Sequence, residues 1–199
     1  MQRPVLYILL FLVFVGCKRC PVFTDDLLNW QPYQTGEVLY FESADKITKT
    51  FKINKHTLTG GERYKGNCEC VCKVKSVISA ESTTNSTEYF NFSINDLEDN
   101  MLIVEINNSF FSCIPNFKKG SYFIEYFKYN EDIKNWDTAD LTIQSKDLSG
   151  ISYSDVIEIE VDTIIYPEYP IWKLSIAKNH GIISFIEKDT QREYFLKTL

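Results

Sequence analysis

The chain consists mainly of short segments in which apolar and polar residues alternate, and this pattern constrains its fold more than any other feature. Between residues 156 and 162, for example, Ile157, Ile159 and Val161 alternate with acidic residues. Successive side chains of a strand point to opposite faces, so each such segment buries one face and exposes the other. Comparable segments occupy residues 37–41, 47–54, 68–78, 89–94, 101–106, 122–129, 141–143, 171–177, 182–186 and 194–197. We therefore predict an all-β chain with a single antiparallel domain, folded as a barrel, a half-barrel or a sandwich.

Three details sharpen this prediction. Lys49 interrupts the apolar face of residues 47–54, which predicts that this strand is not central in the sheet. Gly60 and Gly61 predict a loop after that strand. Gly181 predicts a turn with a positive φ between the strands at Trp172 and Ile183, because glycine adopts positive φ without steric cost.

The N-terminus has the layout of a secretory signal peptide. Arg3 gives a cationic start, residues 5–15 are uninterrupted apolar residues, and Gly16 and Cys17 follow at once. The apolar run is shorter than the roughly 20 residues of a transmembrane helix. We predict a signal peptide at residues 1–16, a lipidated N-terminal tether at residues 17–33 and an antiparallel β domain at residues 34–199.

The size and charge of the chain exclude some partners. Removal of residues 1–16 leaves 183 of the 199 residues, which suits one domain with a single core. The full chain has a formal net charge of −6, whereas a nucleic-acid-binding domain needs a basic face. The 14 Phe and 12 Tyr against 8 Gly favour a folded, strand-rich domain. We expect no nucleic-acid partner.

The signal resembles that of bacterial lipoproteins, and three further stretches resemble small uncharacterised lipoproteins of the Bacteroidetes type. These stretches are residues 30–41, 152–156 and 171–196. The resemblance implies a diacylglycerol on the thiol of Cys17, with palmitate among the acyl chains, and a membrane anchor in the cell envelope. Lys18 and Arg19 stand where surface-displayed members carry acidic residues, which by that analogy favours the periplasmic face of the outer membrane.

Six cysteines in an exported chain suggest disulfides. With Cys17 lipidated, an odd number remains, so at least one thiol is free or pairs between molecules. Cys68, Cys70 and Cys72 alternate on one predicted strand, where they lie too far apart to bridge one another unless the strand bends. They could capture a soft metal ion, but we favour structural bridges that join this set to Cys20 or Cys113, and no metal. Apart from the predicted lipidation site Cys17, the candidates for disulfides are therefore Cys20, Cys68, Cys70, Cys72 and Cys113.

The sequence contains no enzyme motif for phosphate binding, zinc-dependent hydrolysis or serine catalysis. His56 and His180 are its two histidines, and both lie in polar surroundings that suit solvated side chains. The acidic row at Glu158, Glu160 and Asp162 suits the wet face of a strand better than a Ca²⁺ site. We expect no catalysis and no cofactor.

Two non-catalytic functions remain from this reasoning. The first is a membrane-anchored binding module for an apolar ligand or an envelope protein, suggested by residues 122–129, which are apolar and aromatic on both strand faces. The second is a structural or assembly lipoprotein that holds no ligand.

Overall fold

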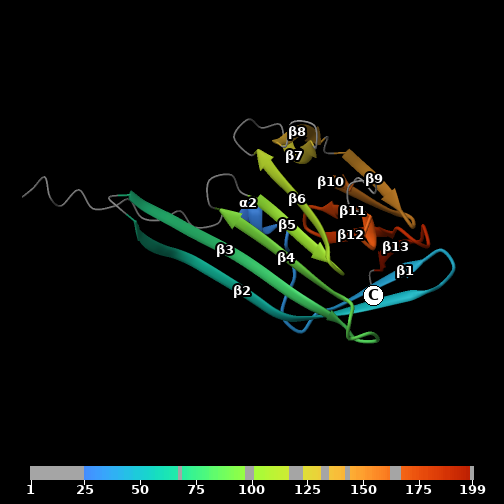
Figure 1. Cartoon of the computed structure of the whole chain (residues 1–199). Coiled ribbons are helices and arrows are strands. Elements are labelled where there is room, and N and C mark those ends of the chain that lie inside the picture. The colour runs from blue at the N-terminus through green and yellow to red at the C-terminus, as the bar shows by residue number, and fades with distance from the viewer. Residues whose placement is uncertain are drawn as a thin grey trace, which may run out of the picture.

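The computed structural model describes residues 25–66, 69–96, 101–116, 123–130, 135–141, 144–161 and 167–197 (Figure 1). This part of the chain is all-β apart from one helical turn, α2 (Asp25–Leu28), which confirms the predicted fold class. Eight strands form the first half: β1 (Val38–Ser43), β2 (Thr48–Gly66), β3 (Glu69–Ser82), β4 (Tyr89–Asp96), β5 (Met101–Ile106), β6 (Ser109–Asn116), β7 (Phe123–Asn130) and β8 (Asn135–Leu141). Five form the second: β9 (Gln144–Leu148), β10 (Ile151–Glu160), β11 (Ile171–Ala177), β12 (Gly181–Glu187) and β13 (Glu193–Lys197).

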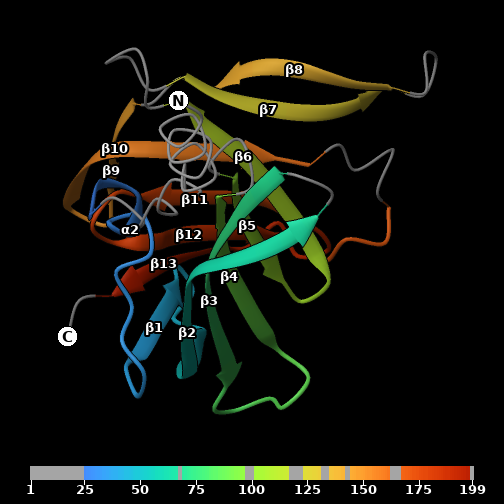
Figure 2. The ribbon, with the colours of Figure 1, turned by 90° about the vertical axis from the view of Figure 1, so that its left-hand side faces the viewer.

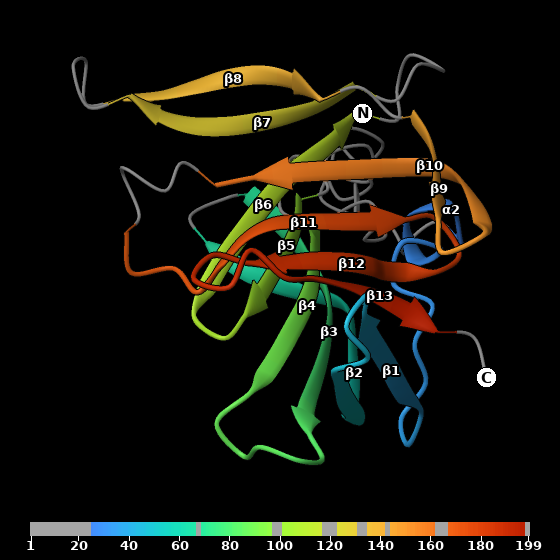
Figure 3. The same ribbon diagram turned by 90° about the vertical axis from the view of Figure 1, so that its right-hand side faces the viewer.

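All thirteen strands belong to one antiparallel sheet in the order β8-β7-β6-β5-β4-β3-β2-β1-β13-β12-β11-β10-β9. Neighbours in the sheet are consecutive in the chain, except that β1 pairs with β13. The sheet curls into a half-barrel, so that β10 to β13 cross over β4 to β6 (Figures 2 and 3). The strands β11 and β6, distant within the sheet, consequently contact each other across the interior.

The core fills the concave side of this curved sheet. Aromatic rings connect the two halves: Phe41 of β1 lies 5.2 Å from Phe185 of β12 between ring centroids, and Phe51 lies 5.5 Å from Phe90. Tilted and edge-on ring pairs of this kind are favourable beyond the area they bury. The other buried apolar side chains of this cluster are Leu27, Trp30, Tyr33, Leu39, Ile53, Ile78, Ala80, Phe92, Ile94, Leu102, Val104, Ile106, Phe111, Ile157, Ile159, Ile171, Leu174, Ile176, Ile182 and Tyr194.

Two expectations about β2 are wrong. The strand is the seventh of thirteen in the sheet, so Lys49 does not mark a peripheral strand. The pair Gly60-Gly61 is not a loop, because β2 continues to Gly66 and the register shifts between Thr59 and Glu62. The extra residue of a β-bulge accommodates the glycines within the strand.

The predicted boundary between tether and domain at residue 34 is also too late. Leu27, Trp30 and Tyr33 are only 2%, 0% and 3% exposed and belong to the core cluster. Part of the segment interpreted as a tether is therefore part of the packed domain. The predicted signal peptide and the remainder of the tether lie outside the described residues.

The structure confirms the predicted turn at Gly181. This glycine has a φ of 70° and joins β11 to β12, two strands of the terminal meander predicted from the sequence. A Cβ placed there would overlap the phenol ring of Tyr33. Two independent constraints, the backbone conformation and the approach of Tyr33, therefore favour glycine at this position.

Gly150 provides a matched control, since it has a φ of 82° and open space around its missing Cβ. We expect Gly150→Ala to lower the free energy of unfolding by about 1 kcal/mol, through backbone strain alone. Gly181→Ala should cost about 3 kcal/mol, because Tyr33 must also move. Urea denaturation measures both values, and equal losses would contradict the contact with Tyr33.

Candidate functional site

The concave face of the half-barrel holds a segment of the chain that belongs to no strand. We call residues 27–33 the N-terminal plug. The ring of Tyr33 lies 5.9 Å from that of Phe90 and 6.3 Å from that of Phe92, between centroids. Burial of such aromatic and aliphatic side chains contributes roughly 1.5–3 kcal/mol each. The plug thus occupies the place where an apolar ligand of a half-barrel would lie.

Gln31 connects the plug to β3 and β4. Its side-chain amide is buried, donates a hydrogen bond to the carbonyl oxygen of Phe92 and accepts one from the hydroxyl of Ser76. Ser76 is itself fully buried on the apolar face of β3, and its Oγ lies 3.1 Å from Nε2 of His56. Buried polar groups are costly without partners, so Gln31 and Ser76 satisfy each other.

The other end of the plug is bound to the turn before β12. The hydroxyl of Tyr33 accepts a hydrogen bond from the amide of Ile182 at 2.5 Å, and the carbonyl of Asn29 accepts one from the amide of Asn179 at 2.6 Å. Burial raises the pKa of the Tyr33 phenol far above its usual value, although the hydrogen bond from Ile182 opposes the shift. The phenol is therefore neutral and serves as a fixed acceptor.

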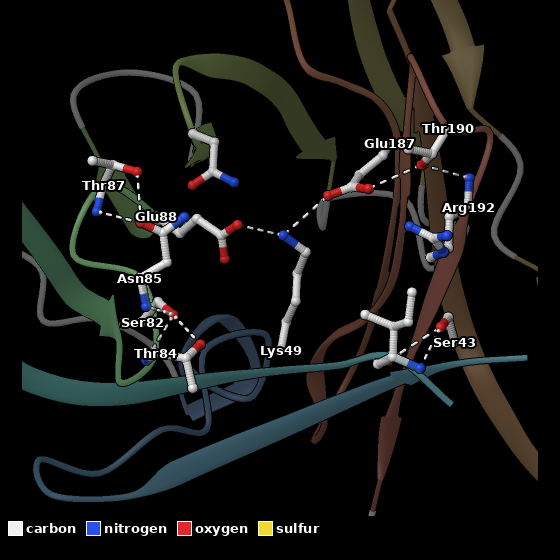
Figure 4. A network of polar contacts seen from close by, with 12 residues as sticks. Ser43, Lys49, Ser82, Thr84, Asn85, Thr87, Glu88, Glu187, Thr190 and Arg192 are labelled. Carbon is white, nitrogen blue, oxygen red and sulfur yellow. Dashed lines mark hydrogen bonds and ion pairs between the residues drawn. The ribbon is translucent and has the colours of Figure 1, made fainter. Parts of the chain in front are cut away.

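A polar cluster lies at the rim of the concave face (Figure 4). The ammonium of Lys49 lies 2.5 Å from Oε1 of Glu88, in the loop before β4, and 3.0 Å from Oε1 of Glu187 at the end of β12. It also lies 5.3 Å from the centroid of the Tyr194 ring. Burial lowers the pKa of Lys49, but hydrogen bonds to the two carboxylates outweigh it, so the net pKa is raised. Lys49 thus connects β2 to both halves of the sheet, which explains a charged residue on a central strand.

The nearby surface contains an open depression of about 420 Å³ beside the β1–β2 turn. An ion pair crosses it, with Nη2 of Arg192 2.9 Å from Oδ2 of Asp45. The depression is open to solvent and mixed in polarity, so it does not resemble a pocket for an apolar ligand. Its lining consists of Ala44, Asp45, Thr190, Gln191, Arg192, Glu193 and Phe195.

The acidic row on β10 is ion-paired. Glu158 contacts the ammonium groups of Lys146 and Lys173, and Glu160 lies 2.7 Å from Lys173. Burial raises the pKa of Glu158, but hydrogen bonding and attraction by Lys146 dominate and lower it overall. Within the residues described, no group of three or more His, Cys, Asp or Glu residues could hold a metal ion. Asp162 lies outside those residues.

The structure places only part of the predicted cysteine set. Cys17, Cys20 and Cys68 lie outside the described residues. Cys70 and Cys72 occupy β3 opposite Lys65 and Arg63.

Cys113 occupies β6, three strands away from β3. The register aligns Cys113 with Leu102, Leu102 with Ile94, and Ile94 with Ser76. Strands lie about 4.8 Å apart, whereas a disulfide joins Cα atoms less than about 7 Å apart. A bridge from Cys113 to Cys70 or Cys72 would therefore need a rearranged sheet, and the predicted pairing with Cys20 stays a prediction.

Both histidines are exposed, as expected, and His180 packs edge-on against Tyr153. Sequence reasoning missed Gln31 and Ser76, the polar residues at the seat of the plug. The available signal was Trp30 and Tyr33, two large aromatic residues within a supposed tether. In an exposed tether, such large apolar side chains would stay in contact with water.

No protein-family model, curated protein or solved structure matches this chain. Among the helices described, none has the length and apolar character needed to cross a membrane.

Lys49 provides a test of the rim cluster. We expect Lys49→Met to lower the free energy of unfolding by about 2 kcal/mol, because two carboxylates lose their common partner. Since the folded-state pKa of Lys49 is raised, this contribution is fully present below the unfolded-state pKa of about 10.4 and is lost as pH rises through the folded-state value.

Lys46→Met is the matched control, because Lys46 is 78% exposed and pairs with Glu42 at 3.0 Å. Urea denaturation should show a loss below about 0.5 kcal/mol for this variant. An equal effect of the two substitutions at neutral pH would show that the Lys49 cluster is an ordinary surface ion pair.

Proposed function

We propose that the chain is a membrane-anchored envelope lipoprotein that acts as a non-catalytic binding module and docks an envelope partner on an outer surface. The observation that carries this proposal is the plug, because the chain itself fills the concave face with Leu27, Trp30 and Tyr33. An apolar ligand would have to displace these side chains and break the hydrogen bonds of Gln31 and Tyr33.

The outer part of the β2–β3 hairpin is the surface best suited to a partner. We call residues 54–66 of β2 and 69–75 of β3 the ribbon. The pairing of β1 with β2 ends at Lys52, and that of β4 with β3 ends at Val74, so most of the ribbon pairs only with itself. Figure 1 shows it extending away from the remaining strands. Two-stranded hairpins are marginally stable alone, so contact with a partner would stabilise the ribbon.

Two exposed apolar residues, one in β2 and one just before it, permit a matched crosslinking experiment. Leu58 lies on the ribbon and is 55% exposed, whereas Ile47 lies before the other end of the strand and is 42% exposed. A photoreactive amino acid at position 58 should give an adduct with a protein or a lipid in native membranes, and the same group at position 47 should give none. Absence of an adduct at position 58, or equal adducts at both positions, would favour the structural lipoprotein without a docking surface.

A second experiment separates this proposal from an apolar-ligand carrier. The Cys17→Ser protein, without an acyl anchor, should unfold cooperatively and show no saturable binding of a hydrophobic fluorophore, because the plug occupies the concave face. Saturable binding by the folded protein, strengthened by Trp30→Ala in a variant that still unfolds cooperatively, would contradict the proposal and identify the interior as a ligand site.

A further inference from the structure

We infer that the partner of the ribbon is an anionic membrane surface, recognised through its headgroup phosphates. This inference rests on the proposed docking function and specifies the chemistry of the partner. The ribbon contains five basic and two acidic residues, in a chain whose net charge is −6. The ribbon is therefore a basic region of an acidic protein, which suits attraction to an anionic surface.

Lys55 and Lys75 of the ribbon differ from most described basic residues of the protein body in their partners. Lys55 and Lys75 are exposed, and neither forms an ion pair with a described residue. Six basic side chains of the body form ion pairs, namely Lys46, Lys49, Lys146, Lys173, Arg192 and Lys197. Lys188 instead donates to the carbonyl oxygen of Pro167, and Lys52 is exposed like the two ribbon lysines. Most described cations of the body are thus neutralised within the protein, whereas the charges of Lys55 and Lys75 are available for an external anion.

The register places both ribbon lysines on one face of the sheet. Lys55 pairs with Ser79, and Lys75 pairs with Thr59. On β3 the intervening Ser76, Ile78 and Ala80 are buried toward the core. Because side chains alternate along a strand, Lys75 and the position opposite Lys55 lie on the outer face. Lys55 and Lys75 are therefore both exposed on the face that can meet a planar surface.

The plug lies beside the base of the ribbon. Gln31 is hydrogen-bonded to Ser76, the residue next to Lys75. Cys17 precedes the first described residue, Asp25, by eight positions, which an extended chain spans in at most about 28 Å. The β3 part of the ribbon extends about 20 Å from Lys75 to Glu69. A membrane holding an acyl group on Cys17 is thus within reach of the ribbon.

The opposite end of β2 lies far from the contact of the plug with Ser76. Leu58, which pairs with Ser76, is ten residues from Thr48 at the beginning of β2, a distance of about 33 Å along the strand. The β1–β2 turn, with Lys46, therefore lies on the side away from the ribbon. A membrane is favoured over an acidic protein as the ribbon's partner because its headgroups present many anionic groups in one plane.

Vesicle binding by the full-length Cys17→Ser chain tests the ribbon without an acyl anchor. Vesicles of phosphatidylcholine alone are compared with an equimolar mixture of phosphatidylcholine and phosphatidylglycerol. We expect binding to the anionic vesicles only, and its loss as added salt shortens the screening length. The Lys55→Gln/Lys75→Gln variant should bind roughly 30-fold more weakly, because each lysine near an anionic surface strengthens binding roughly fivefold.

Lys46→Gln/Lys188→Gln is the matched control, since it changes the net charge equally at residues outside the ribbon. Its binding should stay within about twofold of the parent, because charges remote from the surface are screened. Equal loss in both double variants, or no binding of the parent to anionic vesicles, would overturn the inference. A protein adduct from position 58 without vesicle binding would overturn only the membrane inference, whereas absence of both would also overturn the docking function.

Discussion

The structure depends on filling the concave face of a single curved sheet. One antiparallel sheet that curls into a half-barrel presents an apolar face that must be covered, and here β10 to β13 cover only part of it. The plug supplies the remaining side chains. Its hydrogen bonds extend to both halves of the sheet, through Gln31 to β3 and β4 and through Tyr33 to β12. The plug therefore closes the core and connects the two halves of the sheet.

This constraint directs the functional interpretation toward the outer surface. The interior is occupied by the chain, and the acidic row of β10 is neutralised by Lys146 and Lys173. The described histidines, His56 and His180, have solvent-exposed side chains. We therefore propose the ribbon as the docking surface, because its backbone extends past the neighbouring strands and its Lys55 and Lys75 form no ion pair with a described residue.

Alternation of apolar and polar residues was sufficient to predict the all-β class and the terminal meander, because period-two patterns specify strand faces directly. It failed at Lys49, since the partners Glu88 and Glu187 are distant in sequence and only the curled sheet brings them together. It also failed at Gly60-Gly61, where a bulge replaced the expected loop. The contact between Gln31 of the plug and Ser76 was also missed, because these residues lie 45 positions apart in the sequence. Local patterns carry no information about such contacts.

Hydrogen exchange at the amide of Ile182 tests the role of the plug most directly, because this amide donates to the hydroxyl of Tyr33. The reference is the amide of Ile53, which donates to the carbonyl of Glu37 outside the plug. If the plug is an integral part of the core, both amides exchange only through global unfolding and have equal opening free energies. Faster exchange of Ile182 while Ile53 stays protected would contradict this account, because the plug would then leave the folded sheet and open the concave face to a ligand.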